Sequence, residues 1–99
     1  MSKAIMSITF KLKENVSSAE FLQASDKIQE DYVCKCKGYV SRKLYVQGDI
    51  WTDVIIWETM NDAESSMGES EQNPSAVNFL ALIGEMIQYV VAPLERNYE

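Results

Sequence analysis

Histidine is absent from the 99-residue sequence. That absence excludes a zinc site with a histidine ligand within one chain, a His-ligated haem and a Ser-His-Asp triad. It also removes the side chain that most often accepts a proton near neutral pH. An enzyme with this sequence would depend on Asp53, Glu58 or a tyrosine as its base, and we expect it to use no metal and no other cofactor.

Cysteine is scarce. Cys34 and Cys36 are the only two cysteines, which is too few for a disulfide framework. Near the end of a helix, their C-x-C spacing places them about 200° apart around the axis, so they cannot share one metal unless the helix unwinds. We interpret them as two reduced thiols.

Basic charge and long apolar runs are also in short supply. Nine basic residues against fifteen acidic ones give a net charge of −6, whereas nucleic-acid binding relies on clustered lysine and arginine. The longest apolar runs are far shorter than the roughly 20 residues that span a bilayer, and the N-terminus lacks the apolar core of a signal peptide. We therefore expect a cytoplasmic protein that binds neither nucleic acid nor membranes.

The composition itself is that of a folded protein. Hydrophobic residues make up 46% of the chain and charged residues 24%, which is ordinary for a globular domain. A chain of this length builds one core. We expect residues 1–99 to form a single domain.

The first half of the chain predicts a strand, a helix and a hairpin. Residues 4–12 alternate between apolar and mixed positions, as a strand does. Ser17 and Glu20 have the spacing of a capping box, and the helix that follows carries Phe21, Ile28 and Tyr32 on one stripe before it ends ahead of Gly38. The segments 39–47 and 50–58 flank the Gly48-Asp49 turn of a hairpin.

Neither face of the predicted hairpin is polar. If residues whose numbers sum to 97 pair, one face holds Val40, Arg42, Leu44, Val46, Trp51, Asp53, Ile55 and Trp57. The other holds Tyr39, Ser41, Lys43, Tyr45, Gln47, Ile50, Thr52, Val54, Ile56 and Glu58. Helices can cover only one side of such a sheet, and a large exposed apolar patch indicates an interface. We expect a homodimer that packs two sheets face to face.

The second half predicts a helix and a final strand. Asn61 or Asp62 can cap one short helical turn, and the acidic run "DAESSMGESE" is expected to be solvated, with a lid over a pocket as the alternative. Pro74 opens a helix whose stripe comprises Ala76, Phe79, Leu80 and Ile83, and a strand follows at about 86–92. The order β-α-β-β-α-β predicts an α+β, ferredoxin-like fold with a four-stranded antiparallel sheet.

The stretches "ITFKLKENVSSAEF", "GYVSRKLY", "DVIIWET" and "PSAVNFLALI" give the chain a family resemblance. In this layout the sequence resembles the antibiotic-biosynthesis-monooxygenase-like domains of the dimeric α+β barrel superfamily, over nearly its whole length. The resemblance implies a dimeric barrel. It also implies either a cofactor-independent oxygenase for a small aromatic, quinol-type substrate held between sheet and helices, or one of the small proteins of the superfamily that have no assigned activity.

The haem-degrading branch of that superfamily fits poorly. By resemblance, a member of that branch would have a histidine on the second helix that binds iron, a tryptophan on a helix and an asparagine on the first strand. The second predicted helix has neither histidine nor tryptophan, and the first strand offers Ser7 and Thr9.

Asp53, Trp57 and Arg42 are the candidate catalytic residues. Arg42 and Asp53 lie diagonally across the hairpin on one mostly apolar face, within reach of a charge-assisted hydrogen bond. Such a pair could orient a substrate oxygen, or it could only neutralise two charges that would otherwise be buried unpaired. Trp57 could hold a ligand, or it could be a core residue.

Four further aromatic residues are candidates for substrate binding: Tyr32, Tyr39, Trp51 and Tyr89. The alternative is core or interface packing for Trp51 and core packing for Tyr32. Two functional hypotheses remain open. The first is a cofactor-independent monooxygenase, and the second is a non-catalytic dimer that binds a small ligand or has an accessory role.

Overall fold

The computed structural model describes residues 2–98, so Met1 and Glu99, the two ends of the predicted domain, lie outside the described residues. One antiparallel sheet has the strand order β2-β3-β1-β4 and comprises β1 (Ala4–Leu12), β2 (Tyr39–Gln47), β3 (Ile50–Trp57) and β4 (Ile83–Pro93). The helices are α1 (Ser18–Asp31), α2 (Met60–Glu69) and α3 (Pro74–Ala81), with short 3₁₀ helices η1 (Val33–Lys35) and η2 (Ser70–Gln72). The predicted ferredoxin-like α+β architecture is confirmed.

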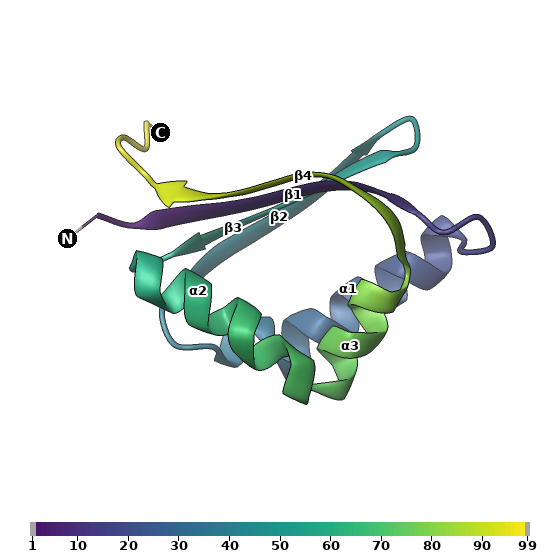
Figure 1. The fold of residues 1–99 in the computed structure, drawn as a ribbon, viewed down its shortest axis with the longest axis horizontal. Helices are drawn as coiled ribbons and strands as arrows, with labels where there is room; N and C mark the ends of the chain where they lie inside the picture. Colours follow the sequence, from purple (N-terminus) through teal and green to yellow (C-terminus); the bar gives the residue numbers. More distant parts are fainter. Residues whose placement is uncertain (1, 99) are drawn as a thin grey trace.

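All three α-helices lie on one side of the sheet (Figure 1). The helix caps explain where they begin. The Ser17 side chain accepts a hydrogen bond from the backbone N–H of Glu20 at 3.1 Å, as the capping-box spacing predicts. Asn73 caps α3 in the same way, and Pro74 occupies its first turn. The predicted first helix is shorter than expected, because α1 ends at Asp31 and η1 carries the chain on to Cys36.

The hairpin register is confirmed from Gln47 back to Ser41, where residues whose numbers sum to 97 pair. Beyond Ser41 the prediction is wrong by one residue. A bulge at Val40 lets Tyr39 pair with Trp57, so Tyr39 turns to the helix side of the sheet and not to the opposite face. An extra residue in one strand shifts every later side chain to the other face, which is the cause of the error.

The acidic run is a helix and not the solvated segment expected from its composition. Thr59 caps α2 by accepting a hydrogen bond from the backbone N–H of Asp62 at 3.0 Å. Ala63 is fully buried and Ser66 is buried beside it, while Glu64 and Glu69 point to solvent. The glutamates therefore cover the outer side of a helix whose inner side faces the sheet, while Asp62 in its first turn is buried.

The last strand is longer than predicted. It begins at Ile83, which was assigned to the preceding helix, and runs to Pro93. Ile83 pairs with Leu12 of β1 and therefore belongs to the sheet, although its spacing had suggested that it was part of the helix.

The core consists of two clusters. The larger packs Phe21 against Phe10, Trp51 and Phe79, with ring centroids 4.9–5.5 Å apart. The smaller comprises Ala4, Met6, Trp57 and Ala63, which join β1 and β3 to α2. Ile55 and Tyr39 contact both clusters.

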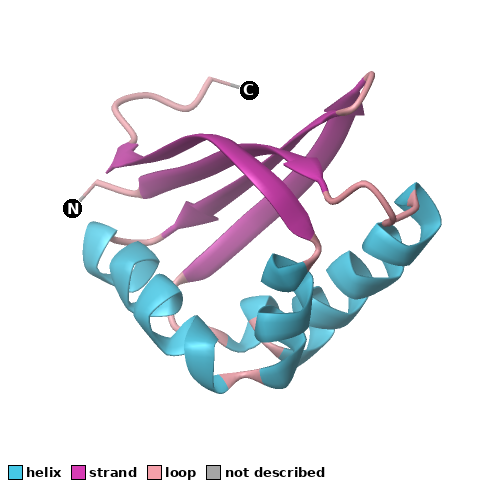
Figure 2. Cartoon of the chain, turned by 45° about the vertical axis from the view of Figure 1, so that its right-hand side comes forward, coloured by secondary structure: helices cyan, strands magenta, loops and turns pink. Residues whose placement is uncertain are grey.

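The face of the sheet away from the helices carries no covering element among residues 2–98 (Figure 2). Four half-buried apolar side chains lie at its centre, Ile5, Val54, Ile56 and Val90, together with the small polar residues Ser7, Thr9 and Thr52. Among the same residues, no helix is long and apolar enough to cross a membrane.

Candidate functional site

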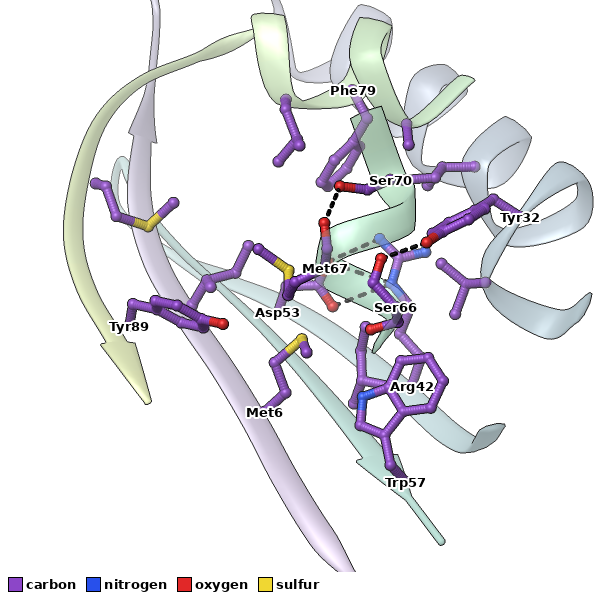
Figure 3. Close-up of a pocket in the computed structure, with 17 residues that line it drawn as sticks. Met6, Tyr32, Arg42, Asp53, Trp57, Ser66, Met67, Ser70, Phe79 and Tyr89 are labelled. Carbon is purple, nitrogen blue, oxygen red and sulfur yellow. Dashed lines mark hydrogen bonds and ion pairs between the residues drawn. The ribbon is translucent and has the colours of Figure 1, made fainter. Parts of the chain in front are cut away.

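A cavity of about 100 Å³ lies between the two core clusters, enclosed by the sheet and the three helices (Figure 3). From the sheet, its wall is formed by Met6, Ile8, Arg42, Asp53, Ile55, Trp57, Met86 and Tyr89. The helices and η1 add Ile28, Tyr32, Val33, Ser66, Met67, Ser70, Ala76, Phe79 and Leu80. The volume is smaller than the roughly 300–1,000 Å³ of common ligand pockets. Three of the wall residues, Met6, Met67 and Met86, have flexible side chains.

Arg42 and Asp53 form the predicted ion pair at the cavity wall. The Arg42 Nη2 lies 2.9 Å from Asp53 Oδ2, and the two side chains are only 7% and 4% exposed. Arg42 Nε also donates to Asp53 Oδ1 at 3.0 Å, which makes the contact bidentate. Burial of the carboxylate is possible because its counter-charge is buried with it.

The same guanidinium joins the sheet to α1. Its Nη2 donates to Ser25 Oγ at 2.9 Å, and its Nη1 donates to the Ser25 carbonyl at 3.2 Å and to Gln29 Oε1 at 3.4 Å. It also lies over the Phe79 ring, 5.5 Å from the centroid. These contacts make Arg42 a connection between β2, β3, α1 and α3.

Trp57 has a buried indole N–H without an acceptor. The side chain is 1% exposed, and among the described residues its Nε1 is the one buried side-chain polar atom that lacks a partner. Nearly all buried polar groups in folded proteins are hydrogen-bonded, because an unmet donor costs about 1–3 kcal/mol. Trp57 lines the cavity together with Met6, and in Figure 3 the nitrogen edge of its indole is turned toward Met6.

Three of the four hydroxyl groups of the cavity wall, all except that of Tyr89, are already used as donors. Tyr32 donates to the Ser66 carbonyl, Ser66 donates to the Ala63 carbonyl, and Ser70 donates to the Met67 carbonyl. Burial raises the pKa of the Tyr32 phenol well above its usual value, and the neighbouring Cys36 raises it further. Tyr32 therefore stays protonated near neutral pH and is unsuited to accept a proton.

The cavity opens between β4 and the helices α2 and α3. Four large apolar side chains mark this mouth and are exposed: Met67, Leu80, Met86 and Tyr89. Tyr89 is about half exposed, at 51%. A ligand would enter past these side chains.

The structure brings five of the seven predicted site residues to one cavity: Tyr32, Arg42, Asp53, Trp57 and Tyr89. Tyr39 lies behind the wall, edge-on to Trp57, and its hydroxyl accepts a hydrogen bond from Gln29 Nε2 at 3.0 Å. Trp51 is 5% exposed and packs in the larger cluster, where it does not line the cavity.

Sequence reasoning missed the contribution of α2 and η2. Ser66, Met67 and Ser70 line the cavity, yet they lie in the run that was expected to be solvated. The signal was available, because Ala63, Ser66, Met67 and Ser70 follow the i, i+3, i+4, i+7 spacing of one helix face. The acidic residues between these positions made the whole segment look like a solvated one, so the spacing was overlooked.

No group of three or more potential ligands among residues 2–98 could hold a metal ion. The two cysteines are unpaired, and Cys34 is exposed while Cys36 is partly buried. Burial raises the pKa of the Cys36 thiol, which keeps it protonated near neutral pH.

No family model matches the sequence, and no curated protein matches it either. Solved structures do match. SnoaB, a cofactor-independent oxygenase from Streptomyces nogalater, superposes with a TM-score of 0.79 at 12% identity, over 98% of this chain and 97% of that one. A protein from Chloroflexus aurantiacus, provisionally assigned to the antibiotic biosynthesis monooxygenases, gives 0.70 at 11% identity over 99% and 98%. Rv0793 from Mycobacterium tuberculosis gives 0.65 at 18% identity over 99% and 98%.

These likenesses extend over nearly the full length of each chain. The protein has the fold of the antibiotic-biosynthesis-monooxygenase-like domains, as its sequence resemblance implied. At identities of 11–18%, the likeness establishes the fold and leaves the activity to be argued from the cavity.

Proposed function

We propose that this protein is a cofactor-independent monooxygenase that binds a small aromatic, quinol-type substrate in the cavity. The observation that carries the proposal is the buried Trp57 N–H without an acceptor in a mainly apolar wall. A substrate carbonyl or phenol oxygen would supply the missing acceptor. Recovering part of the roughly 1–3 kcal/mol lost by an unmet donor would favour binding of such an oxygen over a plain hydrocarbon.

The chemistry can proceed without a bound cofactor because the substrate supplies the electrons. In an anthrone, the methylene carbon loses two hydrogens and gains one oxygen atom from dioxygen. The second oxygen atom leaves as water with those two hydrogens, so one molecule of dioxygen is consumed for each quinone formed. The protein would contribute orientation and exclusion of water.

Two side chains have distinct roles in this proposal. Trp57 contacts the substrate oxygen. Asp53 is held by Arg42 through both carboxylate oxygens, so this pair positions the wall of the cavity and does not take the substrate proton. SnoaB is a cofactor-independent oxygenase, and it shares the fold of this protein. The shared fold is the only support that SnoaB gives to this reaction class.

Oxygen consumption with an anthrone tests the proposal. We expect wild-type protein to accelerate oxygen uptake above the spontaneous rate, and Trp57→Phe to lower that acceleration by at least about tenfold, because one hydrogen bond to a developing oxyanion is lost. Trp51→Phe is the matched control, since Trp51 is also buried but does not line the cavity. Equal rates of oxygen uptake with and without the protein would refute the oxygenase hypothesis.

A second function is favoured by a specific observation. Among the described cavity residues, Asp53 is paired with Arg42, and the Tyr32, Ser66 and Ser70 hydroxyls donate to carbonyls. The wall thus offers no unpaired carboxylate as a base, and Tyr89 at the mouth is its one remaining hydroxyl, which suits a small-ligand-binding or accessory protein. This second function would be supported if an anthrone bound to the protein and quenched its tryptophan fluorescence, while oxygen uptake stayed at the spontaneous rate.

We also propose that two copies of the chain form a homodimer through the bare face of the sheet. The half-buried apolar side chains at the centre of this face, with Ile56 beside Ile5, support this assembly.

The cysteines support a location in the cytoplasm. Cys34 and Cys36 are unpaired thiols, and thiols stay reduced in a reducing compartment such as the cytoplasm.

A further inference from the structure

We propose that the cavity selects neutral aromatic ligands and excludes carboxylates and other anions. The inference rests on the proposed ligand site and defines the class of molecule that it takes. It follows from three features: the state of the one cationic side chain in the wall, the charges around the mouth, and the apolar character of the interior.

The cation in the wall has no hydrogen-bond donor left for a ligand. Among the described cavity residues, Arg42 is the only lysine or arginine. A guanidinium carries five N–H groups. Two of them go to Asp53, two to Ser25 and one to Gln29, and the Asp53 carboxylate offsets the positive charge. An anionic ligand could recruit Arg42 only by displacing a buried carboxylate.

The elements around the mouth carry acidic charge alone. The sequence has no lysine or arginine from residue 44 to residue 95, a stretch that includes all of α2, α3 and β4. Glu64 lies three residues before Met67, which places it on the same side of α2 as that mouth residue. Glu69 and Glu71 follow and are exposed. An approaching anion therefore meets negative potential on the way in.

The interior would penalise a charge that did enter. Removing an ionised carboxylate from water into an apolar site shifts its pKa by up to about 3–5 units. A neutral phenol or ketone avoids this penalty and can still accept a hydrogen bond from Trp57. At pH 7 we therefore expect a carboxylate to bind at least about 100-fold more weakly than a neutral compound of the same shape.

A matched pair of two-ring compounds tests the selection. The neutral probe is 2-naphthol and the anionic probe is 2-naphthoate, titrated separately into full-length protein at pH 7 by calorimetry. We expect 2-naphthol to bind, and 2-naphthoate to bind at least about 100-fold more weakly. Equal or tighter binding of 2-naphthoate overturns the charge selection and leaves the ligand site intact. Failure of both compounds to bind overturns the ligand site and the selection together.

A gain-of-function variant at the mouth makes the test independent of folding defects. Met67→Lys places a cation beside the entrance, and Met67→Gln is the control of similar length without charge. We expect the lysine variant to bind 2-naphthoate at least about tenfold tighter than the glutamine variant, with 2-naphthol affinities that agree within about threefold. Equal affinity of both variants for 2-naphthoate would show that charge does not control entry and would overturn the inference.

Discussion

The aspartate in the middle of the apolar strand β3 is explained by one arginine. Asp53 sits among Ile55 and Trp57 on the helix side of the sheet, where an unpaired carboxylate would be strongly unfavourable. Arg42 offsets the charge and at the same time bonds to Ser25 of α1. The pair therefore fixes the distance between the sheet and α1 at the edge of the cavity.

The stability of this ion pair can be measured by substitution. Asp53→Asn keeps the shape but leaves the guanidinium buried without a counter-charge, so we expect the free energy of unfolding to fall by about 3–5 kcal/mol in urea titrations. Replacing both partners, Arg42→Met with Asp53→Leu, should cost clearly less than the single change, because no buried charge remains. A loss below about 1 kcal/mol for Asp53→Asn would contradict the structural role.

At the scale of elements, α2 decides whether there is a cavity at all. It contributes Ser66 and Met67 to the wall, and η2, which follows it directly, adds Ser70. The helix is anchored by its Thr59 cap and by the buried Ala63. Its buried side is narrow and rich in small residues. We therefore expect its stability to depend strongly on backbone preference.

Two glycines near α2 have opposite predicted responses to alanine. Gly68 lies inside α2, and a Cβ added there meets no atom within 4 Å, so Gly68→Ala should raise the free energy of unfolding by about 0.5–1 kcal/mol. Gly38 has a φ of +83°, and a Cβ there would collide with the Asp62 carboxylate, so Gly38→Ala should lower it. Urea titration of the two variants measures both effects, and a destabilising Gly68→Ala would contradict the helix.

The elements that the sequence predicted best are those whose local signals agree with their packing. The alternation of residues 4–12 matches β1 residue for residue, and Ser17 caps α1 as its spacing indicated. The charge of Asp53 and its distance from Arg42 along the hairpin predicted their ion pair. In these cases, one periodic pattern and one favourable contact point to the same structure.

The remaining elements depend on contacts between distant parts of the chain. The bulge at Val40 has no signal of its own, and it alone decides that Tyr39 contacts Trp57. Whether Trp51 or Trp57 would line the cavity depended on where α2 lies, and the acidic composition of α2 concealed that helix. The unpartnered Trp57 N–H becomes visible only once all neighbouring acceptors have been placed.

At the scale of the whole molecule, the bare face of the sheet predicts the assembly. We expect sedimentation at micromolar concentration to show a dimer, and Ile56→Glu to yield monomers, because a charge at the centre of an apolar interface is left without a partner. Leu22→Glu is the matched control, since Leu22 is 45% exposed on α1, away from that face. A monomeric wild-type protein would contradict the proposed dimer.

The division of the core into two clusters with unfilled space between them has a mechanical consequence. Unfolding removes that void, so the unfolded chain and its solvent occupy less volume than the folded molecule and its solvent. Hydrostatic pressure should therefore destabilise the contact between the two clusters. A ligand that fills the space between them should lower the compressibility of the molecule.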